Sequence, residues 1–245
     1  MRTILVTGGS KGIGLAIVRR FLDAGDKVIT CARDDVYWHQ LIADHPALAS
    51  VDFRRIDLAQ QESLPSLFAY IADTYGHLDV AVNNASPPIA SQGPFETLSS
   101  DNILSTLLSD LWAPAVCMRH ELNLMHGAGA IVNISSVNGL RPTPRAAVYS
   151  AAKHGIEGLT RSVALEAIEK GVRVNSVAPG VIWTPRWETR VAGGLVTKGE
   201  VEQAIPVRRF GTSQDIANAV FWLSSDEAKY VIGHTLVVDG GLSLI

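Results

Sequence analysis

Apolar, β-rich runs recur along the 245-residue chain, and each is separated from the next by a segment long enough to form a helix. The runs are almost continuously apolar, as a parallel strand buried on both faces requires. They lie at Thr3–Thr7, Lys27–Cys31, Val51–Arg55, Leu78–Val82, Ala130–Ser135, Val172–Ala178 and His234–Asp239. Strand alternating with helix is typical of βαβ crossovers. The sequence therefore predicts an α/β fold, a doubly wound parallel sheet with helices on both faces.

The segments between these runs have helical periodicity. They are Gly14–Ala24, Gln61–Tyr75, Leu98–Leu124, Ala147–Lys170 and Ser213–Ser224. Neither a repeat nor a linker divides the chain, so we expect one domain over residues 1–245. Residues 183–206 depart from the alternation and contain two Trp, three Gly and two Pro. A long late insertion of this kind predicts a substrate-binding loop.

Composition excludes several classes of protein. Lys and Arg number 21 against 24 Asp and Glu, which gives a net charge of −3 and argues against nucleic-acid binding. The apolar runs are far shorter than the roughly 20 residues of a membrane span. Cys31 and Cys117 stand far apart, so we expect no disulfide framework and a reducing, cytoplasmic setting. The seven His residues form no metal-binding motif, and we predict no metal site.

A glycine-rich turn joins the first strand to the first helix. A tight turn favours a left-handed residue at Gly8, a side chain at Gly12 would block a pyrophosphate, and Gly14 allows close packing. The following helix N-terminus offers free N–H groups to an anion. The spacing is G-x-x-x-G-x-G rather than the commoner G-x-G-x-x-G. The pattern predicts a dinucleotide site that includes Gly8, Ser10, Lys11, Gly12, Ile13 and Gly14.

The end of the second strand indicates which dinucleotide binds. An NAD site usually has Asp or Glu there, whereas this chain has Ala32 followed by Arg33. Arg33 and Lys11 suit a 2′-phosphate through charge-assisted hydrogen bonds. The alternatives are that both are ordinary surface charges, or that Asp34 and Asp35 partly neutralise them. We predict NADP(H) rather than NAD(H).

Tyr149 and Lys153 stand four residues apart in a predicted helix, so their side chains are neighbours. A phenol has an ordinary pKa near ~10, and an adjacent ammonium favours its phenolate. Ser136 lies at the end of the preceding strand, where its hydroxyl could hydrogen-bond the same substrate oxygen. The three residues together predict general acid/base chemistry on a carbonyl or alcohol.

With these motifs in this order, the sequence closely resembles the short-chain dehydrogenase/reductase family over nearly its whole length. Further matches are Asp57, Asn83-Asn84-Ala85, Arg173 to Gly180 with Thr184, and Val237 to Gly241. The resemblance implies a Rossmann fold with a seven-stranded sheet in the order 3-2-1-4-5-6-7, usually in a homotetramer, or else a homodimer. It implies these roles: Tyr149 as general acid/base, Ser136 as holder of the substrate oxygen, Lys153 as ribose ligand, Asp57, Asn84 and Ala85 on the adenosine side, and Pro179, Gly180, Ile182 and Thr184 on the nicotinamide side.

Two positions depart from the family pattern. Asp110 stands where members usually have an Asn whose backbone carbonyl supports a proton-relay water. The backbone can still act from Asp110, but the amide is lost and a carboxylate near Lys153 would compete for its charge. Ser86 replaces the usual Gly after Asn83-Asn84-Ala85 and places a hydroxyl at the mouth of the cofactor site.

Other side chains near the predicted site have simpler interpretations. Four arginines, at positions 141, 145, 186 and 190, could recognise an anionic substrate, but solvated surface charge is the favoured interpretation. Trp183 and Trp187 could either line a pocket or hold the late loop in place.

The sequence favours an NADPH-dependent reductase that converts a ketone or aldehyde to an alcohol, reversibly. Its partner would be a small-molecule substrate, whose identity the variable loops leave open. One alternative is reduction of a 3-oxoacyl thioester on an acyl carrier protein, although residues 124–130 offer no basic cluster for an acidic carrier. The other is a non-catalytic dinucleotide-binding sensor, against which the intact set of Ser136, Tyr149 and Lys153 speaks.

Overall fold

The computed structural model describes residues 1–194 and 196–245 and contains a parallel seven-stranded sheet in the order β3-β2-β1-β4-β5-β6-β7. The predicted fold and strand order are confirmed. The strands are β1 (Thr3–Thr7), β2 (Lys27–Ala32), β3 (Asp52–Arg55), β4 (Val80–Asn83), β5 (Gly129–Ile134), β6 (Val172–Pro179) and β7 (Thr235–Val238). Every boundary lies within two residues of its predicted position.

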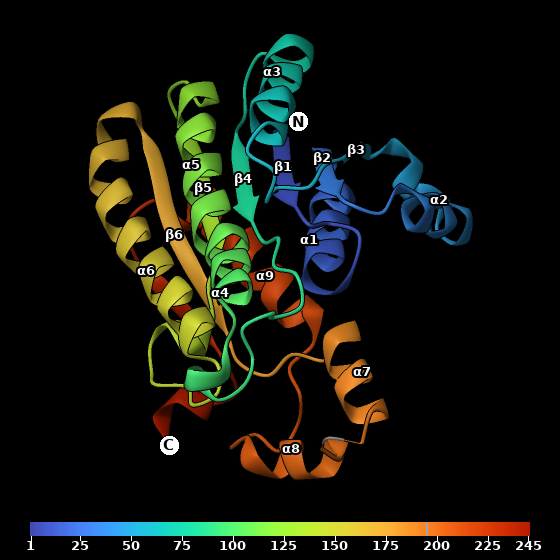
Figure 1. Cartoon of the computed structure of the whole chain (residues 1–245). Coiled ribbons are helices and arrows are strands. Elements are labelled where there is room, and N and C mark those ends of the chain that lie inside the picture. The colour runs from blue at the N-terminus through green and yellow to red at the C-terminus, as the bar shows by residue number, and fades with distance from the viewer. Residues whose placement is uncertain (195) are drawn as a thin grey trace.

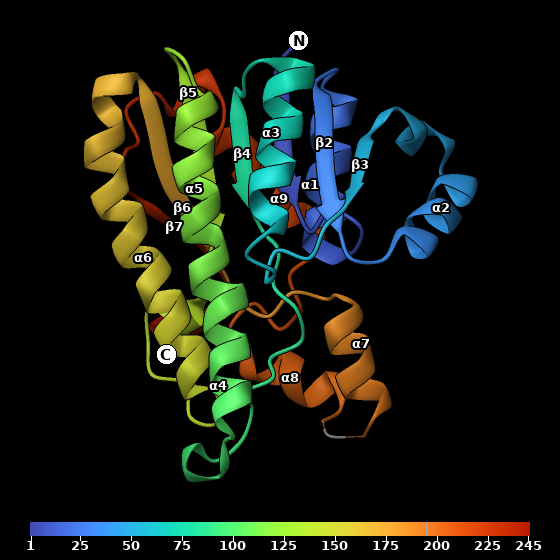
Figure 2. The same cartoon turned by 45° about the horizontal axis from the view of Figure 1, so that its top comes forward.

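Helices cover both faces of the sheet, as Figures 1 and 2 show. Helices α1 (Gly12–Asp23) and α9 (Ser213–Leu223) pack together on one face, and α3 (Ser63–Tyr75), α5 (Ala113–Leu124) and α6 (Ala147–Ala167) cover the other. Helix α2 (Asp35–Asp44) lies beyond the edge strand β3. In the part of the chain that the structure describes, no helix has the length and apolar character needed to span a membrane.

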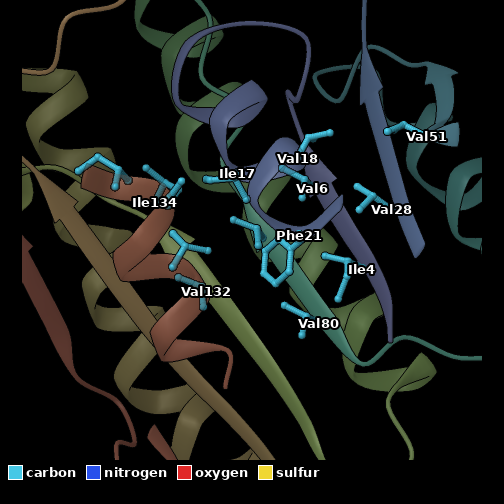
Figure 3. Close-up of a cluster of buried hydrophobic side chains, with 14 of the residues drawn as sticks. Ile4, Val6, Ile17, Val18, Phe21, Val28, Val51, Val80, Val132 and Ile134 are labelled. Atoms are coloured by element: carbon cyan, nitrogen blue, oxygen red, sulfur yellow. The ribbon is translucent and has the colours of Figure 1, made fainter. Parts of the chain in front are cut away.

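The sheet separates two apolar cores, and β1 contributes to both. Ile4 and Val6 pack with Ile17 and Phe21 of α1 in the first core, part of which Figure 3 shows. Leu5, between them in sequence, points into the second core beneath α3, α5 and α6. Successive side chains of a strand alternate between faces, so a strand with two buried faces must be apolar throughout.

The predicted helix over Leu98–Leu124 is interrupted. It consists of α4 (Ser100–Leu107), a π turn over Leu108–Trp112, and α5. Pro114 lies in the first turn of α5 and cannot donate a backbone hydrogen bond to the turn before it. The π turn holds Asp110, whose side chain is buried. An interruption of this kind often marks a functional site.

The predicted substrate-binding loop over residues 183–206 is helical in two stretches. Helices α7 (Pro185–Ala192) and α8 (Lys198–Ala204) form there, beyond the carboxyl ends of the strands (Figure 1). Pro185 at the first helical position and the Thr197–Glu200 capping box are the local signals that start them. Residue 195 of the predicted loop lies outside the described residues.

Candidate active site

The glycine turn has the backbone that its sequence predicts. Gly8 and Gly12 have φ values of +71° and +53°, in the left-handed region that favours glycine. A Cβ on Gly14 would lie 2.2 Å from the Gly8 carbonyl oxygen, so only glycine lets the turn close. A Cβ on Gly12 would meet Thr184 first, at 3.4 Å from its Cγ2 atom. The turn and the segment after β6, far apart in sequence, therefore lie close together beside the N-terminus of α1.

Asn84 and Thr7 fix the turn to the end of β4. The Asn84 Nδ2 atom donates to the carbonyl oxygens of Thr7 at 2.9 Å and Gly8 at 3.2 Å. The backbone N–H groups of Asn84 and Ala85 donate to the Thr7 hydroxyl at 3.0 and 3.1 Å. The Asn84 amide is thus engaged with the protein backbone, and it shapes the site by holding the turn in position.

Lys11 and Arg33 lie at the adenosine end of the site without a carboxylate partner among the described residues. The Lys11 Nζ atom lies 4.0 Å from the centre of the Tyr37 ring, and Arg33 is exposed just after β2. Asp34 accepts a hydrogen bond from the Tyr37 backbone N–H as the cap of α2, and Asp35 pairs with Arg55 at 3.7 Å. The two acidic residues are therefore occupied elsewhere, and both cations can face a phosphate.

Asp57 lies beside the same end of the site. It follows Ile56, whose backbone N–H donates to the Ala32 carbonyl at 2.9 Å. Its own carboxylate accepts from the Ala59 backbone N–H at 3.1 Å, which fixes the side chain in a turn. The predicted adenine contact and the predicted 2′-phosphate contacts thus lie next to each other.

On the nicotinamide side, the segment after β6 is tied to the rest of the fold by its backbone. Close packing requires a glycine at position 180, because the Cβ of any other residue there would lie 2.7 Å from the Cα of Asp239. Ile182 forms a parallel bridge with Gly211 through the Val181 carbonyl and the Trp183 N–H. In such a bridge the N–H and C=O of Ile182 point away from Gly211. They fit a carboxamide, which needs one donor and one acceptor.

The predicted catalytic residues converge at the carboxyl end of β5. Ser136 begins a short 3₁₀ turn, and its Oγ atom accepts a hydrogen bond from the Asn138 N–H at 3.1 Å. The Ser150 hydroxyl donates to the Asn138 carbonyl at 2.7 Å, which ties this turn to the start of α6. Tyr149 is buried in the first turn of α6. The Lys153 Nζ atom lies 5.5 Å from the centre of the Tyr149 ring and donates to the Ile134 carbonyl at 3.1 Å.

Asp110 lies beside Lys153. Its Oδ1 atom is 3.2 Å from the Lys153 Nζ atom, and only 1% and 4% of the two side chains are exposed. Burial lowers the pKa of Lys153, but the charges of Asp110 and Tyr149 outweigh it and raise that pKa above its ordinary 10.5. The carboxylate therefore shares the ammonium with Tyr149.

The arginines near the site are mostly not solvated surface charges. Arg141 donates to the Leu242 carbonyl at 2.7 Å, and Arg190 lies 4.6 Å from the centre of the Trp187 ring. Arg186 donates to two carbonyls of the segment after β4. The partners of Arg141 and Arg186 are backbone carbonyls distant in sequence, so no local pattern could have indicated them, whereas Arg190 and Trp187 stand three residues apart in one helix. Arg145 is exposed at a positive φ of 64°, and its side chain makes no hydrogen bond to the described residues.

The two tryptophans hold the late segment in place. The rings of Trp183 and Trp187 pack edge-on against Phe210, with centroids 4.9 and 5.5 Å from it. Of the two interpretations that the sequence left open, this packing favours the structural one.

Known proteins resemble the chain over its full length. A short chain dehydrogenase/reductase of Aspergillus oryzae, astE, is 36% identical over 251 residues, which cover 100% of this chain and 95% of that protein. The chain belongs to the short-chain dehydrogenase/reductase family. A family model described as enoyl-(acyl carrier protein) reductase matches residues 8–243 of this dehydrogenase/reductase. The 3beta-hydroxysteroid dehydrogenase 1 of Eggerthella lenta is 34% identical to it, over 99% of this chain and 94% of that protein.

A solved structure supports the same assignment. The structure described as ElxO with NADP bound matches this dehydrogenase/reductase with a TM-score of 0.93 and 29% identity over 100% of both chains. The predicted enzyme class, an NAD(P)-dependent oxidoreductase that acts on CH–OH groups, is confirmed.

Proposed function

We propose that this enzyme is an NADPH-dependent reductase that converts a ketone or aldehyde to an alcohol and also catalyses the reverse reaction. The observation that carries the proposal is the buried pair of Tyr149 and Lys153 at the start of α6, with the Lys153 ammonium bound to the Ile134 carbonyl two residues before Ser136. A buried ammonium beside a buried phenol at the carboxyl end of a parallel sheet suits proton transfer to a substrate oxygen. All of residues 1–245 would act as one domain, with residues 183–206 forming the substrate-binding segment.

Each catalytic side chain then has a distinct task. Tyr149 gives its proton to the carbonyl oxygen as negative charge develops there. The Ser136 oxygen accepts from Asn138, so its own hydroxyl hydrogen is free to donate to the same substrate oxygen. Lys153 is held by the Ile134 carbonyl and Asp110, and its charge stabilises the tyrosinate that remains. A bound nicotinamide cofactor would supply the hydride.

The residues at the glycine turn fit NADPH. The nicotinamide carboxamide would lie against Ile182, and the pyrophosphate would lie at the N-terminus of α1, beside Gly12 and Thr184. Lys11 and Arg33 would bind the 2′-phosphate. Residue 32 is an alanine, so no carboxylate there would repel this phosphate. The NADP in the ElxO structure supports this choice.

Assembly and compartment complete the proposal. Leu165 and Ile168 at the end of α6 and Leu244 and Ile245 at the C-terminus are exposed apolar side chains, which suits association into a homotetramer or homodimer. Mass measurement by light scattering tests this, and a monomer would refute it. Cys31 and Cys117 are both free and buried, which suits a reducing cytoplasm.

The test is NADPH oxidation across a panel of ketones, aldehydes, diketones and 3-oxoacyl thioesters. We expect turnover of at least one carbonyl, and a loss of about 10²- to 10⁴-fold in Tyr149→Phe, as removal of a general acid predicts. The NADPH affinity of that variant should stay near wild type. Tyr230→Phe is the matched control, because Tyr230 is fully exposed.

Two results would redirect the proposal. Turnover of 3-oxoacyl thioesters alone would favour the acyl-carrier alternative, which the description of the matched family model also supports. NADPH binding without turnover of any substrate would favour the non-catalytic sensor.

A further inference from the structure

Arg186 joins α7 to the segment that follows β4. Its Nη2 atom donates to the carbonyl oxygens of Ser86 at 3.0 Å and Pro87 at 2.7 Å, and it lies 3.4 Å from the Ser86 hydroxyl. These residues directly follow Asn84 and Ala85, which hold the glycine turn. The side chain therefore crosses the carboxyl edge of the sheet next to the cofactor site.

The charge of this guanidinium has no counter-ion in the described part of the chain. Its two carbonyl partners are neutral, and its Nη1 and Nε groups make no hydrogen bond there. Arg186 forms no ion pair with the described residues. Five other arginines do, in the pairs Arg2–Asp26, Arg54–Asp52, Arg55–Asp35, Arg161–Glu157 and Arg209–Asp215. These unengaged N–H groups of Arg186 can donate to an anion that binds beside α7.

Neighbouring groups place this charge at the catalytic site. Thr184, two residues earlier, lies close to Gly12 in the predicted dinucleotide-binding turn. On the other side, the charge of Arg186 reaches Lys153 and lowers its pKa, against the stronger upward effect of Asp110. Asp110 is already paired with Lys153 and is not available to Arg186.

We propose that Arg186 binds an oxyanion at the catalytic site, either the cofactor diphosphate or a carboxylate or phosphate carried by the substrate. Arginine suits both, because its planar group presents several N–H donors to such oxygens at once. The inference rests on the proposed function for the identity of the oxyanion. The Arg186 side chain then has two roles. It holds α7 against the segment after β4, and it binds the oxyanion beside α7.

The experiment compares Arg186→Ala, Arg186→Lys and Arg190→Ala. The last variant removes the same charge from the same helix, one turn further on, where the guanidinium stacks on Trp187 and its Nε group makes no hydrogen bond among the described residues. In the first arm, fluorescence titration measures NADPH affinity. In the second, kcat/KM is compared between carboxylic acids and their methyl esters, with levulinate and 4-carboxybenzaldehyde as the acids.

If the anion is the diphosphate, Arg186→Ala weakens NADPH binding about tenfold or more, the usual effect of losing a charged hydrogen bond. If it is a substrate group, NADPH binding is kept and any preference for acid over ester is lost. In both cases we expect the affected quantity, either NADPH affinity or the kcat/KM ratio of acid to ester, to be intermediate in Arg186→Lys. The same quantity should stay within about twofold of wild type in Arg190→Ala.

No change in either arm would overturn the inference and leave Arg186 as a purely structural contact. If wild type reduces no carbonyl, the proposed function has failed, and the NADPH titration alone decides the inference. Unchanged NADPH affinity in Arg186→Ala would then overturn it as well.

Discussion

The Lys153 ammonium has to serve two neighbours, Tyr149 and Asp110. A lone ammonium would act fully on the phenol, but a carboxylate at 3.2 Å offsets much of its field. Burial lowers the pKa of Lys153, but the Asp110 charge raises it, so the ammonium keeps its proton to higher pH. The carboxylate thus preserves the positive charge beside Tyr149 while it offsets part of the field of that charge.

Asp110→Asn tests this account. Without the carboxylate, the pKa of Lys153 loses a main upward contribution and falls, so the ammonium beside Tyr149 is lost at lower pH. We expect the alkaline limb of the kcat/KM profile for reduction to move to lower pH. Asp101→Asn, an exposed change in α4, should leave the profile in place. An unmoved profile in Asp110→Asn would restrict Asp110 to a role for its backbone.

Cofactor choice also depends on individual side chains. We expect the double variant Lys11→Ala and Arg33→Ala to lose about 10- to 100-fold of its preference for NADPH over NADH, because two charged hydrogen bonds to the 2′-phosphate disappear. Dissociation constants for both cofactors measure this. Arg55→Ala is the control, since that cation is already paired with Asp35. An unchanged preference would refute the predicted role of both cations.

At the scale of elements, the sequence predicted best what is buried on both sides. All strands were found because their two faces require continuous apolar runs. Helix α2 was missed because only Trp38 and Leu41 are buried along it, too few for a clear periodicity. Helices α7 and α8 bury none of their described side chains fully, and their capping signals stand within a stretch rich in glycine and proline.

Helix α5 carries a buried acid that gives stability a dependence on pH. Glu121 packs against β4 and accepts a hydrogen bond from the Asn83 Nδ2 atom at 3.1 Å. Burial raises the pKa of its carboxyl from 4.5 to about 8, against a smaller opposing effect of that hydrogen bond. The folded protein therefore binds a proton that the unfolded chain releases above pH 4.5. Its contribution to stability falls as pH rises from there to about 8.

Glu121→Gln removes this dependence. We expect the free energy of unfolding of wild type to fall relative to this variant by up to about 1.4 kcal/mol per pH unit as pH rises through that window. Urea denaturation at several pH values measures the difference. Glu227→Gln, at an exposed site, should follow wild type at every pH. A constant gap between wild type and Glu121→Gln would show that the carboxyl titrates normally.

At the scale of the whole molecule, the site is assembled from chain segments that topology brings to one edge of the sheet. The order of motifs predicted the glycine turn, Ser136, Tyr149 and Lys153, because each follows a strand at its carboxyl end. Contacts between the segments that cross this edge were not predictable. Arg186 and Ser86 are 100 residues apart, and their bond depends on where α7 settles after the sheet has formed.

The π turn at Leu108–Trp112 contains one residue more than the α-helix it interrupts. Deleting one residue there would restore continuous α geometry and would rotate α4 by about 100° relative to α5. The surplus residue thus sets the phase between two helices. The Asp110 carboxylate reaches the Lys153 ammonium only in that phase, so its place in the candidate site depends on the number of residues in the turn as well as on their identity.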